Sequence, residues 1–294
     1  MTITQTSTQT SIAHSFPLVA VPLVGSDKQC TWATTLRRGV LAALRRLPVD
    51  NSEDTLYRLA SLHTIPRAAW WIARRNVNAK DIVQQASLYP TFPPITSSSF
   101  GNAYEACSWA SMIAHNRIPG IILDTETTGL TGNVEIVDIA VIDTYGHVLL
   151  NTLVRPTCPI PREATAIHGI TDDMVATAPT FSELWPYLRG LLCHYPLTIY
   201  NAAYDTRVIR QLASRERYSY PPIRAYCAML AYAAFRGIRG IYGDFQWHKL
   251  TQAATYIGAD IGTAHRALGD CQTTLNLIRA MATIDMLEED SPVG

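Results

Sequence analysis

Apolar and polar positions follow different patterns in the two parts of the chain. In residues 31–47 (TWATTLRRGVLAALRRL), four apolar residues recur at helical spacing: Leu36, Val40, Leu44 and Leu47. Ser52, with two acidic residues after it, is typical of a helix start, and Pro66 is typical of a first helical turn. A further helix is expected at 80–88, so residues 31–88 are predicted to form a small, mainly helical region.

Past residue 118, short apolar runs appear first and then alternate with helical patterns. Strands are expected at 121–123, 136–142, 148–154 and 197–200. Helices are expected at 181–192, 205–214, 229–235, 249–257 and 265–284. This order predicts an α/β domain in which helices pack on a mixed sheet.

Segments without a regular pattern suggest the domain boundaries. Residues 1–15 are rich in Thr, Ser and Gln, and we expect a disordered tail over 1–30. Residues 89–117 begin with YPTFPPITSSSFGN and read as a linker, with a short helix at 104–115. The α/β domain is then expected over 118–285, with a C-terminal tail at 286–294.

The composition is that of a globular protein, and its charge is unevenly divided. Of 294 residues, 48% are hydrophobic and 16% charged, and the formal net charge is zero. Residues 1–117 contain 11 Lys and Arg against 6 Asp and Glu, which leaves 13 and 18 for residues 118–294. A basic part beside an acidic part fits a protein that handles nucleic acid, although two ordinary solvated surfaces would look the same.

The cysteines and the N-terminal sequence indicate the cellular compartment in which the protein is expected. The six cysteines are scattered and form no CxxC pair, which is typical of reduced, mostly buried thiols and argues against a zinc site. We see no secretory signal and no apolar run near the roughly 18 residues that a membrane span needs. A cytoplasmic protein without membrane contact is therefore expected.

Three short segments combine residue types that can carry chemistry: DTETTGL at 124–130, NAAYD at 201–205 and HRALGD at 265–270. Asp124 and Glu126 follow a strand and point the same way, so their charges repel unless a cation lies between them. Taken singly, each segment has an ordinary structural alternative. That alternative is a polar strand end for the first pair, a helix N-cap for Asp205 and a capping residue for His265.

Taken together, four carboxylates and one imidazole on separate elements are the ingredients of two-metal phosphodiester hydrolysis. Hard oxygen ligands favour Mg²⁺ or Mn²⁺. A neutral histidine can take a proton from the attacking water.

The order and spacing of the three segments resemble the DnaQ-like exonucleases of the DEDDh subgroup. The motifs of that family are DxETTG followed by Leu or Met, then N-A-x-(F/Y)-D, and H-x-A-x-x-D. Two further segments resemble the sequences of that family, at 167–175 (IHGITDDMV) and 247–260 (WHKLTQAATYIGAD). The resemblance therefore covers about 118–285. It implies a ribonuclease-H-like fold, which is a mixed five-stranded sheet flanked by helices.

The resemblance also implies a role for each matching residue. Asp124, Glu126, Asp205 and Asp270 would hold two divalent metal ions, and His265 would be the general base. The backbone around Thr127 and Thr128 would meet the terminal 3′-hydroxyl. Leu130 would wedge against the terminal base, and His168 would contact the terminal nucleotide. For Thr128, Leu130 and His168, ordinary loop packing is the alternative.

The resemblance implies a 3′→5′ exonuclease that releases nucleoside 5′-monophosphates from single-stranded or frayed DNA ends. The alternatives are RNA 3′-trimming or oligoribonuclease activity, and a non-catalytic module that binds nucleic acid or a protein partner. A homodimer or a protein partner stays open. Arginines after the second motif could follow a substrate strand or be merely solvated: Arg207, Arg210, Arg215 and Arg217. In the N-terminal region, arginines and tryptophans could grip nucleic acid or serve packing: Arg37, Arg38, Arg45, Arg46, Arg74, Arg75, Trp70 and Trp71.

Overall fold

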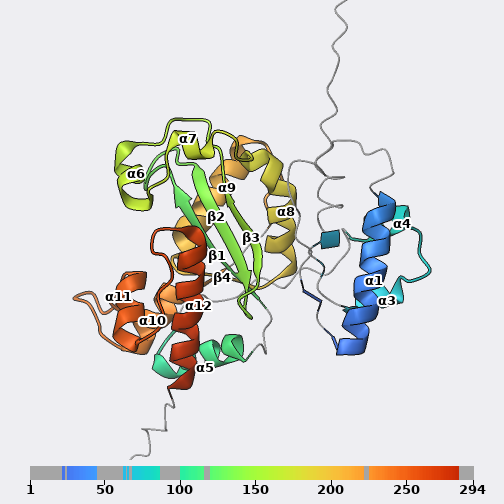
Figure 1. Cartoon of the computed structure of the whole chain (residues 1–294). Coiled ribbons are helices and arrows are strands. Elements are labelled where there is room, and N and C mark those ends of the chain that lie inside the picture. Colours follow the sequence, from blue (N-terminus) through green and yellow to red (C-terminus); the bar gives the residue numbers. More distant parts are fainter. Residues whose placement is uncertain are drawn as a thin grey trace, which may run out of the picture. The chain divides into compact units, whose positions relative to one another are not determined.

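The computed structural model describes residues 22–23, 25–44, 62–63, 65, 68–86, 100–115, 120–221 and 225–284 (Figure 1). The chain divides into two units, one of residues 1–89 with 182–190, the other of residues 90–181 and 191–294. Several expectations lie outside the described residues. They concern the tails at 1–15 and 286–294, the helix starts at Ser52 and Pro66, most of the linker, Arg45 and Arg46.

The described part of the first unit is helical and has its own core. It contains α1 (Asp27–Leu44), α3 (Ala68–Ala73) and α4 (Ala79–Ala86). The core includes Ala33, Ile65, Trp71 and Ile82. Helix α1 begins at Asp27, earlier than the predicted range and inside the expected tail, and an acidic residue in the first turn stabilises a helix there.

Most basic and aromatic candidates described in this unit serve its packing. The Trp71 side chain is buried, and its Nε1–H donates to the Ile65 carbonyl at 3.4 Å. Arg37 is also buried. The Arg74 guanidinium lies 4.2 Å over the Trp70 ring, and its Nε–H donates to Gln85 at 2.8 Å. Trp71 and Arg37 are therefore unavailable to a nucleic acid, whereas Arg38 and Arg75 are exposed.

The second unit is built on a sheet of five strands. These are β1 (Ile121–Thr127), β2 (Ile136–Asp143), β3 (Val148–Leu153), β4 (Leu197–Ile199) and β5 (Ala225–Cys227). Their order is β3-β2-β1-β4-β5. β1 pairs with β2 and β2 with β3 in antiparallel fashion, whereas β1–β4 and β4–β5 are parallel. Every residue of β2 is buried, as expected for a strand covered on both faces.

Helices flank this sheet. They are α5 (Ala103–Ala114), α6 (Arg162–His168), α7 (Asp172–Val175), α9 (Ala202–Arg215), α10 (Ala228–Arg236), α11 (Leu250–Ile257) and α12 (Ala267–Thr283). Helix α8 (Phe181–His194) has most of its residues in the first unit. Helix α12 packs on β1 and β2 and shares a core with α5, α10 and α11, whereas α9 packs on β4 and β5. In Figure 1, α12 lies in front of the sheet and α9 behind it. The predicted ribonuclease-H-like architecture is confirmed.

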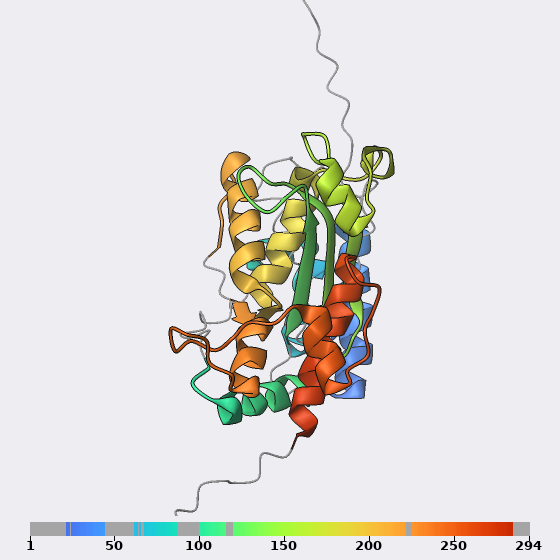
Figure 2. The ribbon, with the colours of Figure 1, turned by 90° about the vertical axis from the view of Figure 1, so that its left-hand side faces the viewer.

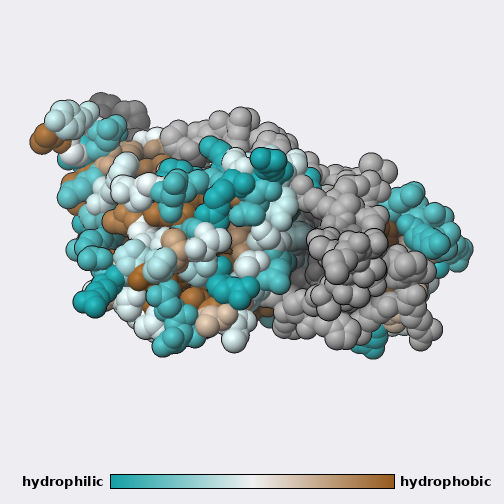
Figure 3. Space-filling model, turned by 90° about the horizontal axis from the view of Figure 1, so that it is seen from above, coloured by the Kyte–Doolittle hydropathy of each residue, from teal (hydrophilic) through white to brown (hydrophobic). Residues whose placement is uncertain are grey.

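The surface and the cysteines add two observations. From above, hydrophobic residues of the second unit are scattered among hydrophilic ones rather than gathered in one large patch (Figure 3). All six cysteines are free, and Cys107, Cys193, Cys227 and Cys271 are buried. Within the described ranges, no helix is long and apolar enough to cross a membrane.

Candidate active site

The first two carboxylates lie at the carboxyl end of β1. Asp124 and Glu126 alternate with buried residues along the strand and therefore project from one face of the sheet. In the ladder with β2, Glu126 stands opposite Asp138. The register shifts between Glu126 and Thr127. Such an irregularity re-aims side chains and is common next to active sites.

Asp205 reaches the same end of the sheet from α9. That helix begins two residues after β4, which runs parallel to β1, so its first turn lies beside the end of β1. The Asp205 side chain is only 4% exposed. Thr125 Oγ1 donates a hydrogen bond to Asp205 Oδ1 at 2.7 Å. This bond helps to fix the orientation of the carboxylate.

His265 and Asp270 come from the two sides of the α12 start. Asp270 lies in the first turn, and His265 precedes the helix with a left-handed φ of 57°. A non-glycine residue there is strained, and strain of this kind clusters at functional sites. The His265 backbone N–H donates to Asp270 Oδ2 at 3.2 Å, so the unusual backbone helps to hold that carboxylate.

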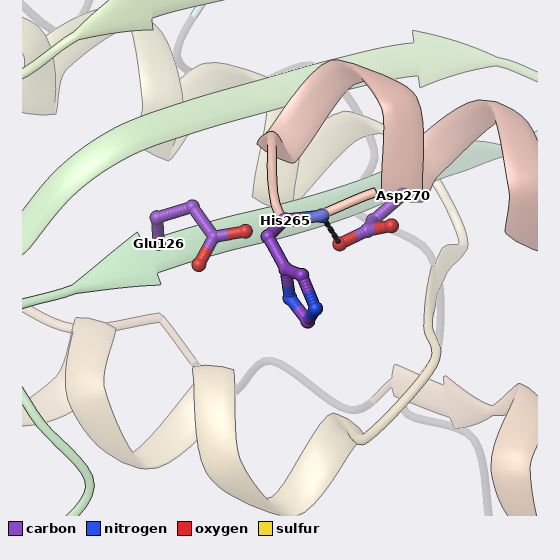
Figure 4. A group of neighbouring side chains, drawn as sticks. All are labelled: Glu126, His265 and Asp270. Carbon is purple, nitrogen blue, oxygen red and sulfur yellow. Dashed lines mark hydrogen bonds between the residues drawn. The ribbon is translucent and has the colours of Figure 1, made fainter. Parts of the chain in front are cut away.

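Glu126, His265 and Asp270 each offer a ligand atom, and these three atoms lie within 4.8 Å of one another. In Figure 4, the imidazole of His265 lies between the two carboxylates and points away from the sheet. Residues of two distant motifs, 124–130 and 265–270, thus lie side by side.

The acids of this site resist ionisation. Burial, and then the charges of Asp205, Asp270 and Glu126, raise the pKa of Asp124 well above its ordinary value. Burial and the neighbouring acids raise the pKa of Glu126 to about 8. Burial raises the pKa of Asp205 to about 7, and burial also raises that of Asp270. So many carboxylates stay charged together at neutral pH only with a compensating positive charge.

This donor set fits a divalent cation. Carboxylate oxygens are the ligands of Mg²⁺ and Mn²⁺, and a bound cation would remove the repulsion that raises these pKa values. Asp124, Glu126, Asp205 and Asp270 are the residues that could hold it. His265 is exposed, and its imidazole lies between the carboxylates of Glu126 and Asp270.

The loop after β1 is held by contacts from α9. Thr127 and Thr128 are buried, whereas Leu130 is 72% exposed. The Thr128 N–H donates to the Glu135 carbonyl at 2.8 Å, so that backbone group already has a protein acceptor. The Tyr204 hydroxyl donates to the Gly129 carbonyl at 2.5 Å, and Arg207 donates to the Leu130 carbonyl at 3.0 Å. Tyr204 and Arg207 therefore fix the loop that presents Leu130.

His168 lies at the end of α6 and is buried. Its Nδ1 accepts the Ile170 backbone N–H at 3.0 Å, which leaves Nε2 as the protonated nitrogen. Burial lowers the pKa of this imidazole, and the Thr127 backbone partly opposes the shift through a hydrogen bond. A neutral His168 therefore lies against the backbone of the first motif.

The arginines after the second motif mostly have contacts within the protein. The Arg210 guanidinium lies 5.3 Å over the Tyr220 ring. Arg215 pairs with Glu135 at 2.6 Å, and Glu135 also accepts from the Thr157 N–H at 2.8 Å. With the bond of Arg207 to the Leu130 carbonyl, these contacts give three of the arginines defined positions on the protein.

Sequence reasoning missed one pair at the site. Asp138 lies in β2 and is almost fully buried. Its Oδ2 is 2.9 Å from Nε of Arg266, the residue between His265 and the first residue of α12. Asp138 interrupts the otherwise apolar run IVDIAVI at 136–142, which was a signal that it has a specific partner. Its partner could not be read from the sequence.

Comparisons with known proteins cover the part of the chain that contains this site. The profile of the exonuclease family RNase_T matches residues 121–278. An uncharacterized exonuclease of Escherichia phage 186, CP81, is 49% identical over 169 residues, which cover 55% of this chain and 87% of the phage protein. Exodeoxyribonuclease 10 of Escherichia coli K12 is 34% identical over 161 residues, which cover 53% of this chain and 66% of that enzyme.

The fold and the acidic site define a nuclease hydrolase. The chain belongs to the exonuclease family, with DnaQ-like and DEDDh relatives. Among solved structures, exonuclease X in complex with 5′ overhanging duplex DNA is 31% identical, with a TM-score of 0.42 over 55% of this chain and 89% of that one. The nuclease domain of 3′hExo, a DEDDh family member bound to rAMP, is 22% identical, with a TM-score of 0.45 over 55% of this chain and 90% of that one.

Proposed function

We propose that this exonuclease removes nucleoside 5′-monophosphates from the 3′ end of single-stranded or frayed DNA, and that it depends on two divalent cations, Mg²⁺ or Mn²⁺. The observation that carries the proposal is the convergence of Glu126, His265 and Asp270 within 4.8 Å, beside two further acids with raised pKa values. Asp124, Glu126, Asp205 and Asp270 would hold the cations, which lower the pKa of a bound water and stabilise charge on the phosphate oxygens.

The remaining roles fall to side chains that already have suitable surroundings. His265 is exposed and has its ring between the carboxylates of Glu126 and Asp270, so its imidazole can take the proton of the attacking water. Leu130 is exposed on a loop that Tyr204 and Arg207 hold, which suits a wedge against the terminal base. His168 and the Thr127 backbone border the position proposed for the terminal nucleotide.

DNA is the favoured polymer because exodeoxyribonuclease 10, by its name, acts on DNA. Only part of that relative's length is matched, so the substrate of the present protein needs its own test. Sugar type is decided by shape and by contacts to the 2′-hydroxyl.

The test uses DNA and RNA of one sequence, about 20 nucleotides long, labelled at either end, with Mg²⁺, Mn²⁺ or EDTA. We expect a cation-dependent ladder that shortens from the 3′ end of DNA and immediate release of a 3′-terminal label. Asp124→Ala should lower turnover by roughly 100-fold or more because it removes a proposed cation ligand. Asp173→Ala changes an exposed acid of α7 and is the matched control.

Each part of the proposal has its own contrary result. Shortening from the 5′ end would overturn the polarity, and faster loss of RNA would overturn the DNA preference. Full activity in EDTA, or an Asp124→Ala protein with the turnover of the wild type, would overturn the metal-dependent mechanism.

A further inference from the structure

The segment between α10 and α11 forms a short hairpin that the three motifs do not explain. We call residues 237–249 the 237–249 hairpin. Gly240 N–H donates to the Asp244 carbonyl at 2.7 Å, and Gln246 N–H donates to the Ile238 carbonyl at 2.8 Å. A bridge joins Arg239 to Phe245. These bonds make the hairpin a defined structure rather than a loose connection.

Large apolar side chains of this hairpin face the solvent. Ile241 is 91% exposed, Tyr242 88% and Trp247 64%. Within the described part of the chain, the Tyr242 and Trp247 rings stack on no other ring and on no guanidinium. Two exposed rings on an ordered segment offer apolar area that a partner can cover.

Arginines accompany these rings. The Arg236 guanidinium lies 3.5 Å over the Tyr256 ring, and the Arg239 guanidinium lies 4.3 Å over the Phe245 ring. Arg239 NH1 also donates to the Gly243 carbonyl at 2.6 Å. Stacking on a ring uses one face of a guanidinium and leaves other N–H groups for phosphate oxygens.

The net charge of the hairpin and its flanking residue Arg236 has the opposite sign to the net charge of the whole α/β part of the sequence. Residues 236–249 contain Arg236, Arg239 and Lys249 against Asp244, a net charge of +2. Residues 118–294 contain 13 basic and 18 acidic residues, a net charge of −5. A basic, aromatic segment in an acidic domain suits a polyanion whose bases can stack.

The base of the hairpin lies at the acidic end of the sheet. The Tyr200 hydroxyl donates to the His248 carbonyl at 2.8 Å. Ile122 pairs with Thr198 in the parallel strands β1 and β4. Two residues further along each chain segment, the same register places Tyr200 beside Asp124. In Figure 2, the orange connection between α10 and α11 projects outward from the body of the second unit.

We propose that the 237–249 hairpin binds the single strand that leads to the 3′ end in the active site. Tyr242 and Trp247 stack on bases, and Arg236 and Arg239 contact phosphates. The inference rests on the proposed function, since it needs a nucleic-acid substrate. A strand is favoured over a protein partner because the exposed rings are accompanied by a net positive charge, which suits a phosphate backbone with bases that can stack.

The test compares a strand with a substrate too small to reach the hairpin. The substrates are single-stranded DNA of about 20 nucleotides and the p-nitrophenyl ester of thymidine 5′-monophosphate. For a Tyr242→Ala, Trp247→Ala double variant, we expect the ratio of KM for the strand to KM for the ester to rise roughly 10-fold or more. Tyr104→Ala, which removes a 68% exposed ring of α5, should leave the ratio unchanged.

Conservative variants separate stacking from damage to the fold. Tyr242→Phe with Trp247→Phe keeps both rings and should keep the KM ratio near that of the wild type. In EDTA, an Arg236→Gln, Arg239→Gln variant should weaken strand binding. The slope of log Kd against log salt concentration should fall by about 0.7 for each phosphate that the variant no longer binds.

The outcomes distinguish this inference from the function on which it rests. A wild-type protein that hydrolyses neither substrate overturns both. A wild-type protein that degrades DNA, beside an alanine double variant with an unchanged KM ratio, overturns the hairpin inference alone. Loss of self-association in that variant, with strand binding intact, would assign the hairpin to a protein interface instead.

Discussion

Arg266 and Asp138 form an ion pair beneath the candidate active site, with 2.9 Å between Arg266 Nε and Asp138 Oδ2. Asp138 lies in β2 opposite Glu126, and Arg266 is the N-cap residue of α12, directly after His265. The pair therefore links β2 to the segment that contains His265, the proposed general base. The Arg266 charge also lowers the pKa of Glu126 and so opposes the effect of the acids around it.

Arg266→Ala should reduce both stability and turnover. It leaves the Asp138 carboxylate, whose side chain is 2% exposed, without its cation, and loss of a hydrogen bond between charged groups costs about 1–3 kcal/mol. The segment of His265 also loses an anchor, and a small displacement of a catalytic group lowers kcat by roughly 10-fold to 100-fold. Urea unfolding and steady-state kinetics measure the two effects.

Arg279→Ala is the matched control on the same helix. Arg279 donates to the Tyr145 carbonyl at 3.1 Å, away from the site, so its loss should affect stability without a comparable fall in kcat. If both variants lowered kcat equally, the Arg266 pair would have no specific role in positioning His265.

The sequence predicted much of this structure because its signals are local. The expected strands at 136–142 and 148–154 lie within one residue of β2 and β3. The first and third motifs contain Glu126, His265 and Asp270, which have ligand atoms within 4.8 Å of one another. The Asp138–Arg266 pair was missed because its members are 128 positions apart, and only the packing of α12 on β2 joins them. Trp71 and Arg37 could not be assigned to core or surface before the packing of α1 was known.

The stability of the metal-free protein should fall as the pH rises from about 4 to about 8. The pKa of Glu126 is raised from 4.5 to about 8 and that of Asp205 from 3.8 to about 7. In this window the folded protein holds protons that the unfolded chain has released, so rising pH favours unfolding. Mg²⁺ or Mn²⁺ should raise the melting temperature more at pH 8 than at pH 5, because it binds the ionised folded site.

Glu126→Gln tests the origin of this slope. The amide cannot ionise, so the melting temperature in EDTA should depend less on pH between 5 and 8, and the stabilisation by cation should shrink. A wild-type protein in EDTA that becomes more stable over this range would show that the carboxylates do not remain protonated in the folded state.

Gly269→Ala should damage the site by moving the segment before α12. A Cβ at Gly269 would lie 2.0 Å from the Thr263 carbonyl oxygen and 2.7 Å from the Thr263 nitrogen. Backbone must shift to relieve such an overlap, and forced packing of this kind costs about 1–3 kcal/mol. Because His265 is two residues beyond Thr263, we expect kcat to fall roughly 10-fold or more.

Gly39→Ala is the comparison for this variant. A Cβ at Gly39, in the middle of α1, would meet nothing within 4 Å, so alanine should stabilise the helix by about 0.5–1 kcal/mol and leave kcat unchanged. A Gly269→Ala protein with normal kcat would mean that the segment accommodates the methyl group without moving His265.

Tyr204→Phe tests whether the tyrosine hydroxyl is used where many family members carry phenylalanine. The hydroxyl donates to the Gly129 carbonyl at 2.5 Å and lies 2.5 Å from the Thr127 hydroxyl, so phenylalanine leaves that carbonyl with one donor fewer. We expect a loss of about 0.5–1.5 kcal/mol in the free energy of unfolding. Arg207 still holds the Leu130 carbonyl, so KM for DNA should rise only about 2-fold to 5-fold, with kcat little changed.

Tyr220→Phe provides the control, because the Tyr220 hydroxyl also donates to a carbonyl, that of Thr206 at 3.4 Å, but away from the Leu130 loop. If the loop contact matters, KM should rise in Tyr204→Phe and stay constant in Tyr220→Phe. Equal KM values for the two variants would mean that the phenylalanine ring alone positions the loop. The hydroxyl of Tyr204 would then contribute to folding and not to substrate binding.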